Sequence, residues 1–204
     1  MKFIPFSRTW SDALAMPVGC VNWPEFSFRP SVCVRFRHDG SALFIRFDVV
    51  EPHVRALEAH DSMPVCHDSC VECFILCGDG RNYMNLECNP LGSLLAARRV
   101  ERHNKVPLGL SEIVKIRRRG NYVGHEPFDH RGEKGERWWL ELEVPFSLLG
   151  FDGFPDVIRL NAYKCGDLTD VKHYLSLFPI ASERPDFHRP EFFGELKPAA
   201  LSHI

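Results

Sequence analysis

Polar side chains recur along the stretch 83–89, where four of them share one predicted strand face. They are Tyr83, Asn85, Glu87 and Asn89. Successive side chains of a strand point to opposite faces, so these four lie opposite the apolar residues between them. The predicted strand 70–77 is apolar on both faces except for Glu72. A carboxyl group in such a strand needs a hydrogen-bonding partner or a bound ligand, so we expect a polar site around Glu72.

A third polar stripe runs along the predicted strand 157–165. Its members are Arg159, Asn161, Tyr163 and Cys165. Planar polar side chains donate and accept two hydrogen bonds at once, which matches the vicinal hydroxyl groups of a sugar. The alternative is that these residues only bond to one another on a covered sheet face. We predict a sugar site on a concave sheet face, with the candidate ligand-binding residues Glu72, Asn85, Glu87, Asn89, Asn161, Tyr163 and Lys164.

Four cysteines follow the spacing C-x3-C-x2-C-x3-C and suggest a metal site as a second possibility. They are Cys66, Cys70, Cys73 and Cys77, with His67 among them. A zinc ion needs four ligands that converge tetrahedrally. On an extended strand Cys70 points away from Cys73 and Cys77, so we expect buried core thiols. A zinc or iron–sulfur site is the alternative.

Catalysis is a third possibility, because histidines and carboxylates cluster in the last third of the chain. They are Asp167, Asp170, His173, Asp186, His188 and Arg189. An acid–base pair with Glu72 or Glu87 would resemble the paired carboxylates of glycosidases. The sequence places no such pair at a defined distance and contains no nucleophile elbow, zinc-protease motif or phosphate-binding loop. We therefore expect a protein that is not an enzyme.

These residues must be positioned by strands, because apolar and polar side chains alternate over short runs. Strands are predicted at 32–37, 43–49, 70–77, 82–88, 93–99, 112–118, 138–144, 157–165, 172–178 and 192–197. Helical turns are predicted only at 53–59 and 146–149, and the polar, glycine-rich segment 119–136 is predicted as a surface loop. This pattern predicts an all-β fold, a sandwich of two antiparallel sheets with few short helices.

Length and composition restrict the class of protein. The 204 residues, 45% of them apolar, fit a single domain spanning 1–204. The net charge of −2 and the scattered basic residues argue against nucleic-acid binding. No apolar run reaches the ~18 residues of a membrane span. The N-terminus has no signal-peptide pattern, which predicts a cytoplasmic, reducing location with free thiols and no disulfides.

Four segments resemble the family 9 carbohydrate-binding modules and the related DOMON-like domains of carbohydrate-degrading bacteria. The segment 64–75 resembles the family pattern W-x-D-S-V-E-x-F-I, and 83–89, 161–167 and 185–194 follow in the same order. The resemblance covers roughly 15–197. It implies a distorted jelly-roll sandwich that binds a sugar or oligosaccharide, in some members at reducing ends, with structural calcium in some members. Most such modules act outside the cytoplasm. Some DOMON relatives bind haem through Met and His. The methionines of this sequence form no pair at a recognisable spacing.

The resemblance also implies residue roles. Glu72 falls where the family hydrogen-bonds sugar, and Glu87 falls where the family can use an arginine. The two tryptophans that hold the sugar ring correspond to Cys66 and Leu177, neither of which can stack on a ring. Phe178, Tyr163 or Tyr174 are the aromatic candidates in their place. The alternative function is therefore a structural or protein-interaction domain that has lost its sugar site. The oligomeric state stays open.

Overall fold

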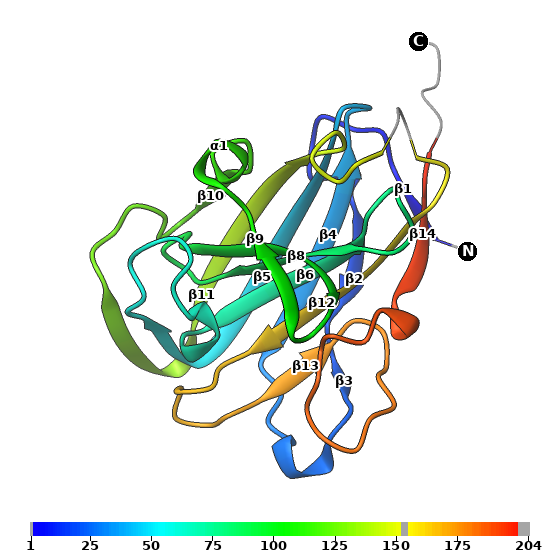
Figure 1. The fold of residues 1–204 in the computed structure, drawn as a ribbon. Helices are drawn as coiled ribbons and strands as arrows, with labels where there is room; N and C mark the ends of the chain where they lie inside the picture. Colours follow the sequence, from blue (N-terminus) through cyan, green and yellow to red (C-terminus); the bar gives the residue numbers. More distant parts are fainter. Residues whose placement is uncertain (1, 152–154, 200–204) are drawn as a thin grey trace.

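The computed structural model describes residues 2–151 and 155–199, which form two β-sheets packed face to face (Figure 1). The strands are β1 (Lys2–Ile4), β2 (Leu14–Pro17), β3 (Cys20–Val21), β4 (Ser31–His38), β5 (Ala42–Ala56), β6 (Cys70–Leu76), β7 (Tyr83–Cys88), β8 (Leu94–Glu101), β9 (Asn104–Pro107), β10 (Arg117–Gly120), β11 (Phe128–Pro145), β12 (Ile158–Cys165), β13 (Tyr174–Ser176) and β14 (Gly194–Pro198). The helical segments are the single α-turn α1 (Leu110–Ile113) and the short 3₁₀ segments η1 (Pro24–Phe26), η2 (Val65–His67) and η3 (Pro190–Phe192). None of the helices in this described part of the chain is long and apolar enough to cross a membrane.

The larger sheet has nine strands and the smaller sheet has five. The larger runs in the order β1-β14-β12-β6-β7-β8-β9, with β13 paired to β12 and β3 paired to β13. The smaller runs β10-β11-β5-β4-β2. The first and last strands, β1 and β14, lie side by side and pair in parallel, whereas the strands that carry the predicted site pair antiparallel. The predicted sandwich of two sheets is confirmed.

The core lies between the sheets, where the alternation of the sequence places it. On the smaller sheet the residues that alternate inward are Val34, Phe36, Ile45, Phe47, Leu140 and Leu142, and each is at most 1% exposed. On the larger sheet Cys73 and Ile75 of β6 and Leu160 of β12 complete the same cluster. Burial of these apolar side chains on facing sheets is what stabilises the sandwich.

Two predictions around β5 and β11 are wrong. The expected helical turn at 53–59 is strand as far as Ala56, because β5 extends through it. The expected loop 119–136 is strand from Phe128 onward, since the first residues of β11 pair with the end of β5. The register shifts between Arg131 and Glu136, where Gly135 takes a positive φ of 81° that favours glycine. Backbone groups make this pairing on both sides of a bulge, so the polar side chains at the start of β11 do not show strand periodicity.

The predicted strand 112–118 is also wrong in its first half. Residues 110–113 form α1, and β10 begins only at Arg117. The Glu112 carboxylate accepts a hydrogen bond from the Gly109 backbone N–H at 3.1 Å, and Arg98 of β8 pairs with the same carboxylate at 2.7 Å. This capping contact favours a helical turn over a strand at this point.

The outer face of the larger sheet carries a second apolar cluster, which we call the outer-face cluster. Its members are Trp23, Val65, Cys70, Phe74, Tyr83, Tyr163, Cys165, Ile180, Phe187 and Phe193. Residues 180–193, the covering segment, pack on residues of β6, β7 and β12 and close this face. Strand 70–77 is therefore covered on both faces, as its double apolar pattern predicted.

Candidate functional site

Glu72 of β6 and Glu87 of β7 lie at the floor of a cleft in the outer face of the larger sheet. They are direct partners in the register of the two strands and are 4% and 7% exposed. Facing side chains on neighbouring strands lie about 4.5–5.5 Å apart at Cβ. The cleft has a volume of about 170 Å³ and is lined by Cys66, Glu72, Glu87, Arg102, Cys165, Asp167, Tyr174 and residues 185–188.

A hydrogen-bonded relay holds Glu87. Arg99 Nε donates to Asn85 Oδ1 at 2.7 Å, and Asn85 Nδ2 donates to Glu87 Oε1 at 2.6 Å. Burial raises the pKa of Glu87 to about 7, against the attraction of Arg99 and the bond from Asn85. Glu87 therefore exchanges a proton near neutral pH and is oriented by two buried partners.

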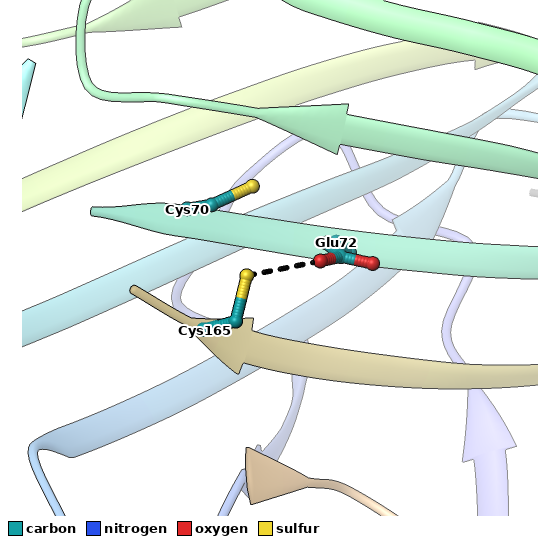
Figure 2. Close-up of side chains that lie close together, drawn as sticks. All are labelled: Cys70, Glu72 and Cys165. Carbon is teal, nitrogen blue, oxygen red and sulfur yellow. Dashed lines mark hydrogen bonds between the residues drawn. The ribbon is translucent and has the colours of Figure 1, made fainter. Parts of the chain in front are cut away.

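Glu72 has a weaker partner. The Cys165 thiol donates to Glu72 Oε1 at 3.1 Å (Figure 2), and a thiol is a weak donor. Burial, followed by the nearby Glu87 carboxyl, raises the pKa of Glu72 well above its ordinary value. A buried carboxyl with so little compensation is suited to accept hydrogen bonds from a ligand in the cleft.

Two aromatic side chains form the cleft wall. Tyr174 donates its hydroxyl hydrogen to Asp167 Oδ1 at 2.7 Å, which fixes its ring. Phe187 of the covering segment stacks on Tyr163, with ring centroids 4.2 Å apart and an interplanar angle of 13°. Tyr163 itself is fully buried behind Phe187 and donates to the Phe187 carbonyl at 3.1 Å. The wall thus offers aromatic surface, and Tyr163 supports it from below.

The rim of the cleft is mostly acidic. Asp167 and Asp186 add two carboxylates, and Arg102 lies 3.5 Å from Asp186. His188 makes a hydrogen bond with the Tyr83 hydroxyl at 2.9 Å, and burial lowers the pKa of His188 to about 3, so its ring is neutral at pH 7. This rim favours ligands that are neutral or positively charged over acidic ones.

The other predicted binding residues lie elsewhere. Asn161 bonds to the backbone of Phe178 through both amide atoms, at 3.0 Å each, and Phe178 packs on Gly194. Asn89 donates to the Asp68 carboxylate and to the Glu58 carbonyl, at 2.8 Å each. These contacts tie the chain together outside the cleft.

Lys164 lies on the opposite face of β12 from Asn161 and Tyr163. Its Nζ pairs with Glu51 Oε2 of β5 at 2.9 Å inside the sandwich. Strand alternation separates consecutive residues, so Lys164 could not share a face with Tyr163. The structure therefore brings together Glu72, Glu87 and Asn85, with Tyr163 behind them, and leaves Lys164, Asn161, Phe178 and Asn89 outside.

Neither residue at the family tryptophan positions supplies an aromatic face. Cys66 lines the cleft, but Leu177 is buried in the core between the sheets. Tyr174, one of the three aromatic candidates, does line the cleft. Sequence patterns missed Phe187 and Arg102, because neither lies on a strand with a periodic pattern, although Phe187 falls in the segment 185–194 that carries the resemblance.

A second hollow of about 350 Å³ lies at another place, where 51–53, 131–132 and 169–173 meet. Its charged groups and His53 already have ion-pair partners, in the hollow or next to it. His53 Nε2 lies 2.7 Å from Asp129, Arg131 Nη2 lies 2.9 Å from Asp170, and Glu51 is held by Lys164. Among the residues that the structure describes, the Glu72 carboxyl has only the Cys165 thiol as a hydrogen-bonding partner, so we place the candidate site in the smaller cleft.

The cysteine run does not form the four-ligand site that its spacing suggests. Cys73 and Cys77 lie in the core between the sheets, whereas Cys70 lies in the outer-face cluster. All eight cysteines are free thiols. Among the described residues, the compact group of possible metal ligands is Cys70, Glu72 and Cys165. Calcium takes six to eight oxygen ligands, so this set with two sulfur atoms does not fit the calcium that the resemblance implies.

Comparisons with known proteins agree on the family. The model of carbohydrate-binding family 9 matches residues 9–198. A crystal structure of a candidate carbohydrate-binding protein from Bacteroides uniformis is 28% identical, with a TM-score of 0.89 over 98% of both chains. No curated protein matches the chain.

Two more distant structures share the fold. They are a family 9 carbohydrate-binding module from Caldicellulosiruptor kristjanssonii in complex with cellotriose and in complex with glucose, each 12% identical. Their TM-scores are 0.64 and 0.63; the matches cover 99% and 100% of this chain and 95% and 97% of those chains. Because the family model matches nearly the whole chain, the chain belongs to carbohydrate-binding family 9.

Proposed function

We propose that the chain is a non-catalytic module that binds a neutral sugar reversibly in the cleft above Glu72 and Glu87. The observation that carries this proposal is the pairing of these two carboxyls on the cleft floor beside the aromatic wall of Tyr174 and Phe187. Carboxyl oxygens accept hydrogen bonds from sugar hydroxyls, and an aromatic face packs against the apolar face of a sugar ring.

The size and charge of the cleft restrict the kind of sugar that it can bind. Its volume of about 170 Å³ is below the range of about 300–1,000 Å³ of sites for drug-sized ligands, which favours a single sugar unit. Four carboxyl groups line the cleft against the single guanidinium of Arg102. A uronic acid would add its own carboxylate to these acidic groups, so a neutral sugar is favoured.

Titration calorimetry against glucose, N-acetylglucosamine, cellotriose and glucuronic acid tests the proposal. We expect saturable heat with a neutral sugar, a loss of affinity of tenfold or more in Glu72→Gln, and no heat with glucuronic acid. Glu195→Gln is the matched control, since Glu195 is exposed on β14, away from the cleft. Sugars recovered after incubation should be chemically unchanged.

A protein-interaction module of the same fold is the second candidate. The observation that favours it is that neither Cys66 nor Leu177 provides the stacking surface of the family tryptophans. Folded protein that gives no heat with any sugar, or sugar binding that Glu72→Gln leaves unchanged, would contradict the proposed site. The first of these outcomes would favour a protein partner.

A further inference from the structure

Two thiols and a carboxyl converge at the inner end of the cleft, although they are far apart in the sequence. Cys70 and Glu72 lie on β6 and Cys165 lies on β12, and Figure 2 shows their side chains gathered on one face of the two paired strands. One ligand atom from each lies within 4.8 Å of the other two. We propose that Cys70, Glu72 and Cys165 bind a thiophilic divalent cation, for which Zn²⁺ is the best match.

The spacing of the three ligand atoms is close to what zinc requires. Zn–S bonds of about 2.3 Å and Zn–O bonds of about 2.0–2.2 Å place tetrahedral ligands about 3.3–3.8 Å apart. The Cys165 sulfur and Glu72 Oε1 are already 3.1 Å apart, and Cys165 is the register partner of Cys70. Small side-chain rotations, without movement of the strands, bring the three atoms around one ion.

The chemistry of the donors selects the ion. Two thiols and one carboxylate suit zinc and cadmium, whereas calcium and magnesium prefer oxygen ligands alone. On binding, each thiol releases its proton to solvent and forms a bond to the metal through sulfur, and the Glu72 carboxyl also releases its proton to solvent and bonds to the metal through oxygen. The cation also compensates the Glu72 carboxylate, whose hydrogen-bonding partner within the described chain is the weak Cys165 donor.

The fourth coordination position faces the cleft. Glu72 and Cys165 both line the cleft, and the Cys66 thiol lies in the same wall. Sites with three protein ligands and one open position leave room for water or another oxygen ligand. The proposed metal site does not rest on sugar binding, so the metal can be measured in the absence of any sugar.

The test uses the full chain, reduced and freed of metal with a chelator that is then removed. Titration with Co²⁺ and Cd²⁺ should give thiolate-to-metal charge-transfer absorption that saturates at one equivalent per chain, and Zn²⁺ should displace Co²⁺. Cys70→Ala and Cys165→Ala should each abolish the band, and Glu72→Gln should weaken binding tenfold or more. Cys33→Ser is the matched control, because Cys33 is a half-buried thiol on the other sheet.

Two outcomes would overturn the proposal. One is no charge-transfer band at one equivalent in folded wild-type protein, and the other is a band of unchanged intensity in the Cys70→Ala and Cys165→Ala variants. Thermal unfolding of each variant shows whether it is folded. If a cysteine variant unfolds, Glu72→Gln keeps the side-chain shape and decides the test. Sugar binding without metal binding would refute this site alone, and metal binding without sugar binding would refute only the proposed function.

Discussion

His188 illustrates how burial sets the protonation of a single residue in the cleft wall. Its ring stacks on Phe74 with centroids 4.9 Å apart and bonds to the Tyr83 hydroxyl. Burial, followed by the charges of Arg99 and Arg102, lowers the pKa of His188 to about 3. A histidine with a lowered pKa in the folded state stabilises the fold above its unfolded pKa of about 6.5, and this stability is lost as the pH falls through that value towards about 3.

We therefore predict a pH-dependent difference in stability between wild type and His188→Phe. At pH 7 the variant should be less stable by about 1 kcal/mol, because the Tyr83 hydroxyl loses its partner. Between pH 6.5 and 4.5 wild type should lose up to about 1.4 kcal/mol per pH unit relative to the variant, so the order of stability reverses. Urea unfolding at pH 7, 5.5 and 4.5 measures both. A difference that stays constant with pH would contradict the buried neutral ring.

Substitutions of Tyr174 test whether the aromatic wall of the cleft contacts the sugar. Tyr174→Ala should weaken sugar binding about tenfold, which corresponds to about 1.4 kcal/mol, because the ring surface is lost. Tyr174→Phe should keep most of the affinity, since it removes only the bond to Asp167. Calorimetry with the best neutral sugar measures both variants, and Tyr122→Ala is a matched truncation in the loop between β10 and β11. If Tyr174→Ala bound the sugar as tightly as wild type does, the Tyr174 ring would not contact the ligand.

At the scale of elements, the sequence predicts the strands in which apolar and polar side chains alternate. The strands that carry Val34 and Phe36, and Leu140 and Leu142, were predicted at 32–37 and 138–144, because burial on one face imposes a period of two. The pairing of β5 with the start of β11 could not be predicted, because that segment is polar and its pairing is made by backbone groups. Phe187 in the cleft wall was missed for a similar reason: apart from the short η3, the covering segment has no regular structure to give it a period.

For the covering segment, we predict that it opens on its own when its anchor is removed. Phe187 is 9% exposed and anchors the segment on Tyr163. Phe187→Ala should lower the free energy of unfolding by about 3 kcal/mol, and amide exchange should accelerate in residues 180–193 more than in β4 and β5. Tyr163→Phe, which loses only the bond to the Phe187 carbonyl, should cost about 1 kcal/mol. If exchange accelerated equally in all strands, the segment would not open on its own.

At the scale of the whole molecule, a buried polar network joins the two sheets. Lys164 of the larger sheet pairs with Glu51 of the smaller, and Trp138 of β11 donates to Glu51 at 2.8 Å. Lys164 also donates to His173 Nε2 at 3.0 Å and to the Cys165 carbonyl at 2.8 Å. The sequence predicted Lys164 as a ligand-binding residue, because its buried partner Glu51 is more than a hundred residues away in the chain and cannot be identified from the sequence.

This network predicts strong coupling between Lys164 and Glu51. Lys164→Met should lower the free energy of unfolding by about 3–5 kcal/mol, because it leaves the Glu51 carboxylate buried without its cation. The double variant with Glu51→Gln should recover most of that loss, since an uncharged amide can still accept the bond from Trp138. Urea unfolding of the two single variants and the double variant measures the coupling energy. Losses that simply add in the double variant would mean that the two charges do not stabilise each other, and the sheets would then be held by their apolar faces alone.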